Sequence, residues 1–304
     1  ACSIYLKLMH KASLKDFILL ITLAAIWGSA FFNIKIASVD YTPMALAFGR
    51  IFFAALVMII YCFIRGIHLE AFGENWRWYA TIGLVNLVLP FFCISFGIIK
   101  VQSNLAAILM STAPIFAAIL SHLFIPNEKI NFLKCLGILV GFLGIVFLFS
   151  DDLLINSSNI FYAFMVILGP AFYTLGGLFS LRLKHVKNEV VTSSILVWAV
   201  MILLPIMFFF ENPLNLRPSL ETTISLFYLG VVATAIAWLV RFYILKKNGL
   251  VFQSQVAYII PIFGLIFGYI FLQEKITYKI IVALISVLIS TYLIEKSKKI
   301  KSVT

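Results

Sequence analysis

Long apolar stretches follow one another along the chain, and short segments with charged residues or proline separate them. A helix across a bilayer core takes about 20 apolar residues. The stretches are continuous rather than alternating, so helices are predicted and a membrane barrel is excluded. The ten predicted transmembrane helices cover residues 17–37, 43–64, 76–98, 103–125, 131–150, 159–181, 191–210, 222–245, 250–272 and 277–295.

The composition agrees with an all-α integral membrane protein. Hydrophobic residues make up 63% of the chain and charged residues 12%, with a mean hydropathy of +1.09. Soluble domains carry about 25% charged residues, so a water-soluble globule is excluded. The net charge of +11 would suggest nucleic-acid binding in a soluble protein. In a membrane protein it reflects cytoplasmic loops rich in lysine and arginine, so the bilayer is expected as a partner and nucleic acid is not.

One pattern occurs twice. Pro114–Ile119 leads to Glu128–Ile130, and Pro261–Ile266 leads to Glu274–Ile276, with the two prolines 147 residues apart. A repeat on this scale predicts a duplicated structure. Each proline lies within a predicted helix, where it predicts either a break at the depth of a transport site or a simple kink. Glu128 and Glu274 are interpreted as negative charges at the start of the fifth and tenth helices.

Two copies of five helices must enter the membrane from opposite sides, because five is odd. Such an inverted repeat predicts alternating access, with a central cavity near the midplane between the halves. Sixteen lysines and arginines fall on the side of the termini and four on the other side, so both termini are predicted to be cytoplasmic. The predicted units are a cytoplasmic segment 1–16, a first repeat 17–150, a second repeat 159–295 and a cytoplasmic basic tail 296–304.

The chain resembles a known family. Trp27-Gly28-Ser29, Pro43 followed by Arg50, the two Pro…Glu-Lys copies and the glycine-bearing helix that includes Gly137 are similar to EamA-type members of the drug/metabolite transporter superfamily. The resemblance implies a carrier of the bacterial inner membrane, often an exporter of amino acids or other small metabolites. It also implies that the fifth and tenth helices lie outside a cavity formed by the other eight.

Candidate substrate-binding residues come from two patterns. Polar residues recur on one face of the fourth and ninth helices, which must face protein or water, and a count along each span places further aromatic and polar residues near the midplane. The alternatives are interhelical hydrogen bonds, worth about 0.6 kcal/mol each, and simple core packing. The same count also places Thr234 there. The candidates are Trp27, Arg50, Asn86, Asn104, Ser111, Thr112, Tyr173, Trp238, Gln255 and Tyr258.

Arg50 lies about two helical turns inside its span, which is roughly 10 Å from the outer surface. It is either a structural arginine bonded to helix-end carbonyls or a counter-charge for a substrate carboxylate. The carboxylates all fall at span ends or in loops. A proton-driven cation pump commonly uses an acid within the membrane. Facilitated transport or exchange of a neutral, zwitterionic or anionic metabolite is therefore favoured.

These patterns favour a secondary transporter of a small metabolite over three alternatives. The alternatives are a membrane enzyme acting on a lipid-linked substrate, a multidrug or cation exporter of the same fold, and a structural or receptor scaffold. No HExxH, no GxSxG and no acidic cluster beyond Asp151-Asp152 supports catalysis, and the scattered histidines and cysteines predict no metal or cofactor. We expect a monomer; a homodimer through a GxxxG face formed by Gly137, Gly141 and Gly144 is the alternative.

Overall fold

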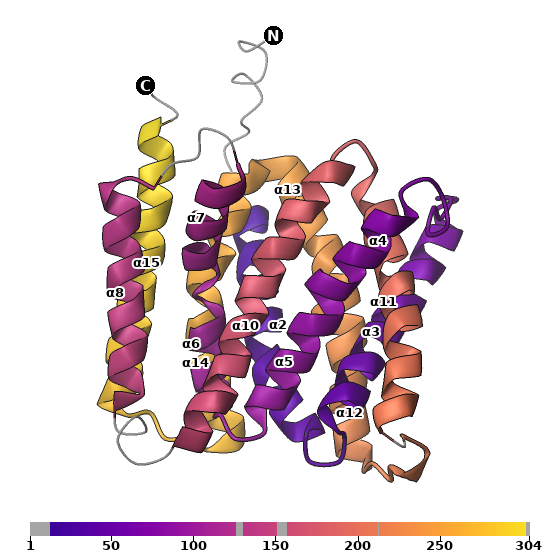
Figure 1. Ribbon diagram of the computed structural model, residues 1–304, viewed down its shortest axis with the longest axis horizontal. Helices are drawn as coiled ribbons and strands as arrows, with labels where there is room; N and C mark the ends of the chain where they lie inside the picture. The colour runs from indigo at the N-terminus through magenta and orange to yellow at the C-terminus, as the bar shows by residue number, and fades with distance from the viewer. Residues whose placement is uncertain (1–12, 126–129, 151–156, 212, 302–304) are drawn as a thin grey trace.

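The computed structural model describes residues 13–125, 130–150, 157–211 and 213–301, and this part of the chain is all-helical (Figure 1). Nine helical spans within it are long and apolar enough to cross a membrane, and α8 is a shorter apolar helix. The α-helices are α2 (Leu14–Ala37), α3 (Pro43–Ile64), α4 (Trp76–Gly83), α5 (Leu89–Ile98), α6 (Ser103–Met110), α7 (Ala113–Phe124), α8 (Phe132–Leu148), α10 (Ser157–Ser180), α11 (Asn188–Phe210), α12 (Leu220–Gly230), α13 (Ala237–Ser254), α14 (Val256–Leu272) and α15 (Tyr278–Lys301). Between them lie the π-helical segments η1 (Leu84–Val88) and η4 (Val231–Ile236) and the 3₁₀ turns η2 (Leu181–Leu183) and η3 (Pro213–Asn215).

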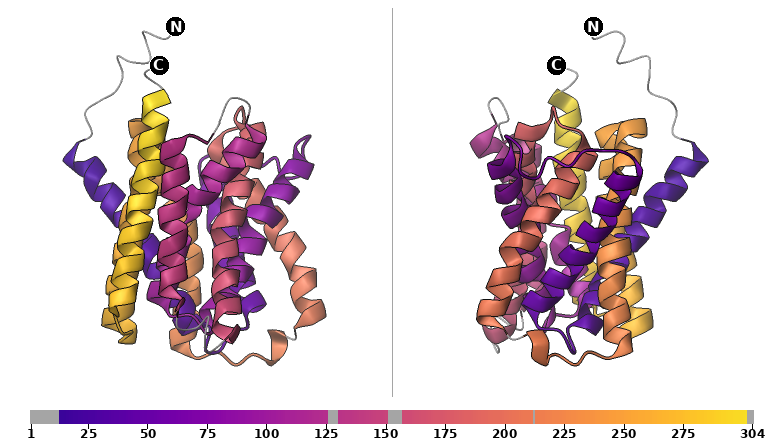
Figure 2. Two further views of the ribbon diagram at one scale, coloured as in Figure 1. Left: turned by 60° about the vertical axis from the view of Figure 1, so that its left-hand side comes forward. Right: turned by 90° about the vertical axis from the view of Figure 1, so that its right-hand side faces the viewer.

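The helices run side by side between two faces of the molecule (Figures 1 and 2). We call the face where α2 begins and α15 ends the terminal face, and the other the opposite face. α8 and α15 pack together at one edge of the bundle, outside the remaining helices. This arrangement matches the expectation that the fifth and tenth predicted helices lie at the periphery.

Glycines on α8 allow the close packing of this outer pair. A Cβ atom at Gly144 would lie 2.4 Å from Cβ of Ser286, and one at Gly137 would lie 2.9 Å from the carbonyl oxygen of Ser290 on α15. Large side chains would therefore force α8 and α15 apart. The GxxxG face is covered by α15 of the same chain, so it is not available for the homodimer contact considered above.

The same local features occur twice along the chain. Gly83 and Gly230 each stand directly before a π-helical segment, η1 in one case and η4 in the other. Gly83 packs against the backbone at Ile195 of α11, and Gly230 packs against the backbone at Arg50 of α3. In both places the absent side chain lets two helix backbones touch beside the π-helical turn.

The two repeated prolines differ in their effect. The first copy is broken: α6 ends at Met110 and α7 begins at Ala113, just before Pro114. The Ser111 hydroxyl donates to the Ala107 carbonyl at 3.0 Å and the Thr112 hydroxyl to the Leu109 carbonyl at 2.7 Å. These hydroxyl groups compete with backbone N–H groups for the helix carbonyls, which weakens the helix at this point. The second copy has Tyr258 and Ile259 in their places, and α14 continues through Pro261.

Glu274 caps a different helix from the one expected. Its carboxylate accepts hydrogen bonds from the backbone N–H of Ser103 and Asn104 and from the Ser103 hydroxyl, all at the start of α6 rather than α15. Gln273, with φ of 52°, ends α14 in a left-handed conformation, and the Glu274 N–H then bonds to the Gly268 carbonyl at 3.1 Å. This tight turn places the carboxylate on α6. Glu128 lies outside the described residues.

Asp40 makes a similar connection at the opposite face. It accepts hydrogen bonds from the Ser219 N–H at 2.9 Å and the Thr222 hydroxyl at 2.8 Å, at the start of α12. These bonds hold the pKa of the Asp40 carboxyl below its usual value. Asp40 and Glu274 thus each join a loop of one half of the chain to a helix start in the other.

Two predicted boundaries were wrong. Residues 246–249, predicted as a loop, continue α13, and the break falls at Gln255. Lys247 and Asn248 both bind Asp16 of α2, a long-range interaction that holds them in a helical turn and that local pattern does not contain. The chain from 296 to Lys301, predicted as a separate tail, extends α15, and Ser297 is buried there.

Candidate functional site

Arg50 is a buried cation within the bundle. Its side chain on α3 is 8% exposed, and its Nε donates to the Thr234 hydroxyl of η4 at 2.9 Å. Its guanidinium carbon lies 4.0 Å from the ring centroid of Phe91 on α5. Within the described residues no carboxylate pairs with it. Burial of a charge without a counter-charge is costly, so an anionic group beside this cation would be favourable.

The π-helical segment η4 supplies the hydrogen-bond partner of Arg50. A π-helical turn carries one extra residue and leaves carbonyls free of their normal partners. The Thr234 hydroxyl, which is buried, donates to the Leu229 carbonyl at 2.8 Å and accepts from Arg50. Thr234 therefore satisfies the backbone and orients Arg50 at the same time, as is common where π-helical turns occur at functional sites.

The aromatic ring beside the guanidinium contacts a second aromatic ring. The ring of Phe91 meets that of Tyr173 on α10 edge to face, with 6.1 Å between centroids. Tyr173 and Trp238 are both partly buried and pack against the same apolar cluster as Phe91. A face of aromatic rings beside one cation suits a ligand with both a carboxylate and an apolar or cationic part.

Asn86 belongs to the same region. Asn86 lies in η1. A Cβ atom added to Gly176 of α10 would lie 2.5 Å from the Cβ atom of Asn86, so the two helices are in close contact here. Gly176 is one turn along α10 from Tyr173. Contacts join Arg50 to Thr234 and Phe91, and Phe91 to Tyr173, while Asn86 and Trp238 lie in the neighbouring packing. We call these six residues the Arg50 cluster.

The cation occurs in only one half of the chain. The glycine contacts described above place Arg50 beside Gly230 and Ile195 beside Gly83, so Ile195 on α11 is the counterpart of Arg50. Ile195 is buried and apolar. The site is therefore asymmetric, as the difference between the two copies of the sequence suggested.

Three candidates lie on neighbouring helices. Trp27 on α2 is partly buried and packs against a cluster that includes Ala237, the residue before Trp238. Ser111 and Thr112 are buried at the break between α6 and α7, where their hydroxyls bond to backbone carbonyls. Each hydroxyl keeps an acceptor lone pair at this break.

The remaining three candidates lie near the two faces. Gln255 is exposed at the terminal face, between α13 and α14. The Tyr258 hydroxyl donates to the Glu295 carboxylate on α15 at 2.9 Å, which directs it toward the outer helix pair. Asn104 is buried near the opposite face beside Glu274, and within the described residues its side-chain amide has no hydrogen-bond partner.

Phe91 was not among the sequence candidates, although one signal could have identified it. Phe91 and Trp238 each lie 23 residues before the repeated proline. They are therefore counterparts in the two copies, and the choice of Trp238 implied Phe91.

Comparison with known proteins now decides the family. The model of the EamA-like transporter family matches residues 14–150 and again 160–295. The chain belongs to the EamA-like transporter family. It is accordingly a multi-pass membrane protein of a transport family, as the resemblance in the sequence indicated.

Relatives cover most of the chain. It is 27% identical over 264 residues to "Uncharacterized transporter YoaV" of Bacillus subtilis (strain 168), covering 86% of this chain and 90% of that protein. It is 24% identical over 286 residues to a "Probable amino-acid metabolite efflux pump" of Escherichia coli (strain K12), covering 87% and 89%. "Uncharacterized inner membrane transporter YedA" of Escherichia coli (strain K12) is 25% identical over 255 residues, covering 82% and 80%.

A solved crystal structure has the same fold. It superposes with a TM-score of 0.65 at 16% sequence identity and covers 92% of this chain and 96% of that chain. At this identity the likeness concerns the fold alone.

Proposed function

We propose that the protein is a secondary transporter that carries a small zwitterionic or anionic metabolite across the bacterial inner membrane by alternating access. The Arg50 cluster is its substrate site. The observation that carries the proposal is a buried arginine that is oriented by Thr234 and Phe91 and has no carboxylate partner within the described residues. A substrate carboxylate would supply the missing counter-charge.

The rest of the cluster fits an amino acid or a similar metabolite. Tyr173 and Trp238, which are partly buried, offer aromatic rings to an apolar side chain or an ammonium group. Asn86 offers an amide that both donates and accepts. One relative is named a probable amino-acid metabolite efflux pump, which supports this class of cargo.

The proposed architecture is ten transmembrane helices in two inverted five-helix repeats, residues 17–150 and 159–295, around a central cavity. It is supported by the nine candidate spans with α8 as the tenth helix, by the two family matches and by the recurrence of glycine and π-helical turn. Both termini are cytoplasmic in this proposal. The terminal face is then the inner face of the membrane.

A multidrug or cation exporter is the second candidate with the same fold. Such a protein needs an acidic group that a cation can reach within the membrane. Among the described residues, Asp16 is bound to Lys247 and Asn248, Glu295 to Tyr258, and Glu274 to the start of α6. Each of these carboxylates already has donors and lies toward one face, so an anionic or zwitterionic cargo is favoured. A membrane enzyme finds no support in the transporter names of the relatives.

Flux through vesicles that contain only this protein tests the proposal. We expect saturable exchange of a carboxylate-bearing metabolite between the inside and the outside, with little dependence on a pH gradient. The physical reason is that the Arg50 cluster contains neither a carboxylate nor a histidine, the groups that commonly exchange protons in such transporters. Exchange that needs a pH gradient, or flux of organic cations but not of carboxylates, would contradict it. Vesicles without protein serve as the control.

A further inference from the structure

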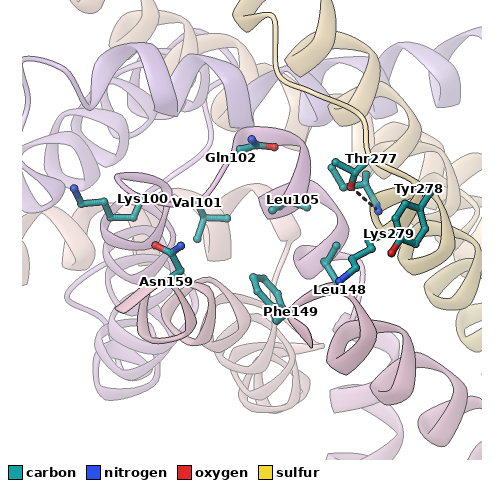
Figure 3. Close-up of a pocket in the computed structure, with 11 residues that line it drawn as sticks. Lys100, Val101, Gln102, Leu105, Leu148, Phe149, Asn159, Thr277, Tyr278 and Lys279 are labelled. Atoms are coloured by element: carbon teal, nitrogen blue, oxygen red, sulfur yellow. Dashed lines mark hydrogen bonds between the residues drawn. The ribbon is translucent and has the colours of Figure 1, made fainter. Parts of the chain in front are cut away.

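A separate pocket opens at the opposite face, away from the Arg50 cluster (Figure 3). Its volume is about 370 Å³, within the range of small-ligand sites. It lies where the α5–α6 connection and the start of α6 meet the end of α8 and the starts of α10 and α15. Its apolar lining is Val101, Leu105, Leu148, Phe149, Tyr278 and Ile280. Its polar lining is Lys100, Gln102, Asn159, Thr277 and Lys279.

The two lysines of this pocket differ in their contacts. Lys279 is already engaged, because its Nζ donates to the Ser150 hydroxyl at 2.8 Å. Lys100 is exposed, and within the described residues it forms no ion pair. Lys35 lies close to Lys100, because its Nζ donates to the carbonyls of Ile99 and Val101. An exposed lysine in a positively charged region with an adjacent apolar wall is suited to a ligand that ends in a carboxylate.

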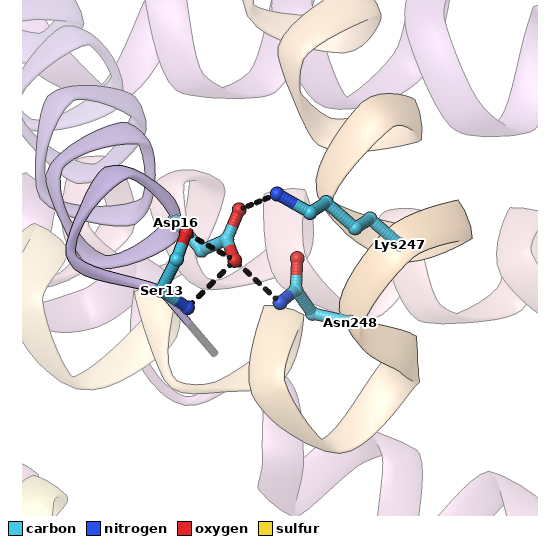
Figure 4. Close-up of polar contacts among 4 residues, drawn as sticks. All are labelled: Ser13, Asp16, Lys247 and Asn248. Carbon is cyan, nitrogen blue, oxygen red and sulfur yellow. Dashed lines mark hydrogen bonds and ion pairs between the residues drawn. The ribbon is translucent and has the colours of Figure 1, made fainter. Parts of the chain in front are cut away.

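The counterpart of Lys100 in the other half of the chain shows what such a lysine binds. Lys100 and Lys247 each lie 14 residues before the repeated proline. At the terminal face, Lys247 forms an ion pair of 2.8 Å with Asp16, and Asn248 donates to the same carboxylate at 3.1 Å (Figure 4). The Asp16 hydrogen bond raises the pKa of Lys247. The side chain of Asp16 is only 2% exposed, so its carboxylate is shielded from water.

The start of α10 at the opposite face carries an amide where the start of α2 carries a carboxylate. Asp16 is the third residue of α2, and Asn159 is the third residue of α10. Both Asn159 and Lys100 line the pocket. An amide cannot neutralise a lysine as a carboxylate does. The opposite face therefore has an open pocket and, within the described residues, a lysine without an ion pair, where the terminal face has an ion pair.

We propose that this pocket binds the carboxylate of a small organic acid, with Lys100 as its counter-ion in the role that Lys247 has toward Asp16. The apolar part of the acid packs against Leu105 and Phe149. In the proposed orientation this is a site at the periplasmic mouth, where a carboxylate metabolite binds before or after the Arg50 cluster. The inference uses the repeat relation of the proposed function but does not need the Arg50 cluster.

The test measures access to the pocket. Gln102 lines it and is exposed, so Gln102→Cys provides a reporter for an uncharged, membrane-impermeant maleimide. The protein is held in lipid discs, and the same labelling without the substitution gives the background from native cysteines. Butyrate is the probe, and butyramide is its neutral control of nearly equal size, both at matched ionic strength.

We expect butyrate to slow labelling and butyramide to leave it unchanged. Lys100→Gln should weaken protection by butyrate roughly fivefold or more, as for a partly exposed ion pair of about 1 kcal/mol. Asn159→Asp places a carboxylate of the protein in the pocket, so labelling should be slow even without butyrate. Added butyrate should then slow it no further. Asn159→Gln, the control, should behave like the parent protein. Arg50→Gln should leave protection unchanged, which separates this site from the proposed function.

Three results would overturn the proposal. One is equal protection by butyramide, which would mean that the pocket has no preference for charge. Another is full protection in Lys100→Gln. The third comes from the lipid: if discs that contain phosphatidylglycerol slow labelling, discs of phosphatidylcholine do not, and butyrate adds nothing, then the anion of this pocket is a lipid headgroup rather than a soluble acid.

Discussion

Replacement of Arg50 by alanine should reduce transport of a carboxylate-bearing metabolite by roughly 100-fold, or about 2.8 kcal/mol, while folded yield falls much less. The loss arises because a substrate carboxylate would enter a desolvated site without its counter-charge. Folded yield is spared because the free protein loses a buried cation whose partners, within the described part of the chain, are a hydroxyl and a ring. Exchange in protein-only vesicles, normalised to folded protein, measures the effect.

Matched variants separate charge from geometry. Arg50→Lys keeps the charge but lacks the planar fork that stacks on Phe91 and the Nε that bonds to Thr234, so intermediate transport is expected. Thr234→Val removes the hydroxyl that orients Arg50 and should raise the half-saturating concentration with less effect on maximal rate. Equal losses of transport and of folded protein in Arg50→Ala would show that the arginine serves only the fold.

Glu274→Ala should lower the free energy of unfolding by about 2 to 4 kcal/mol, the largest effect on stability that we expect from a single polar substitution here. The carboxylate is 9% exposed and satisfies three donors at the start of α6. Without it, two backbone N–H groups remain buried and unpaired. Glu274→Gln should cost about half as much, because one amide oxygen still accepts while the amide nitrogen opposes the donors. Thermal unfolding in detergent measures the differences.

Gly268 provides the control for this contact. A Cβ atom at Gly268 would lie 2.4 Å from the Glu274 carboxylate, so Gly268→Ala should be destabilising by about 1 to 3 kcal/mol through overpacking. In a chain that already carries Glu274→Ala this overlap disappears. The double variant should therefore be more stable than the sum of the single effects predicts, by about 1 kcal/mol. Strict additivity would mean that Glu274 does not occupy this position.

Sequence reasoning located the helices well because each is a long apolar stretch with a charged or proline-containing end. It failed where a distant residue decides the local structure. The Lys246–Gly249 segment has the composition of a turn, yet Asp16 binds Lys247 and Asn248 and keeps them helical. The position of Glu274 predicted a charge at the start of the next helix. The left-handed conformation of Gln273 instead directs the Glu274 carboxylate to the start of α6. No local pattern contains either interaction.

The candidate site shows the same division. Counting along spans found Arg50, Asn86, Tyr173 and Trp238, which the structure brings into one cluster. It also selected Tyr258, because it assumed a helix that begins at 250 and places this residue deep in the membrane. In the structure α14 begins at Val256, so Tyr258 is in its first turn and bonds to Glu295. The π-helical turns that contain Asn86 and Thr234 could not be predicted from the sequence. One extra residue in a helical turn leaves the membrane span as apolar as before, and its length stays within the range of ordinary spans.

The most direct test of the central claim is a thermal-shift screen of the purified protein and of Arg50→Gln against amino acids, other small carboxylates and organic cations. A ligand at 100 times its dissociation constant adds about 2.7 kcal/mol to the stability of the protein that binds it. The Arg50 cluster predicts that carboxylate-bearing compounds stabilise the parent protein and that Arg50→Gln loses this stabilisation. Stabilisation by organic cations alone, or equal stabilisation of both proteins by a carboxylate, would contradict a substrate site built around Arg50.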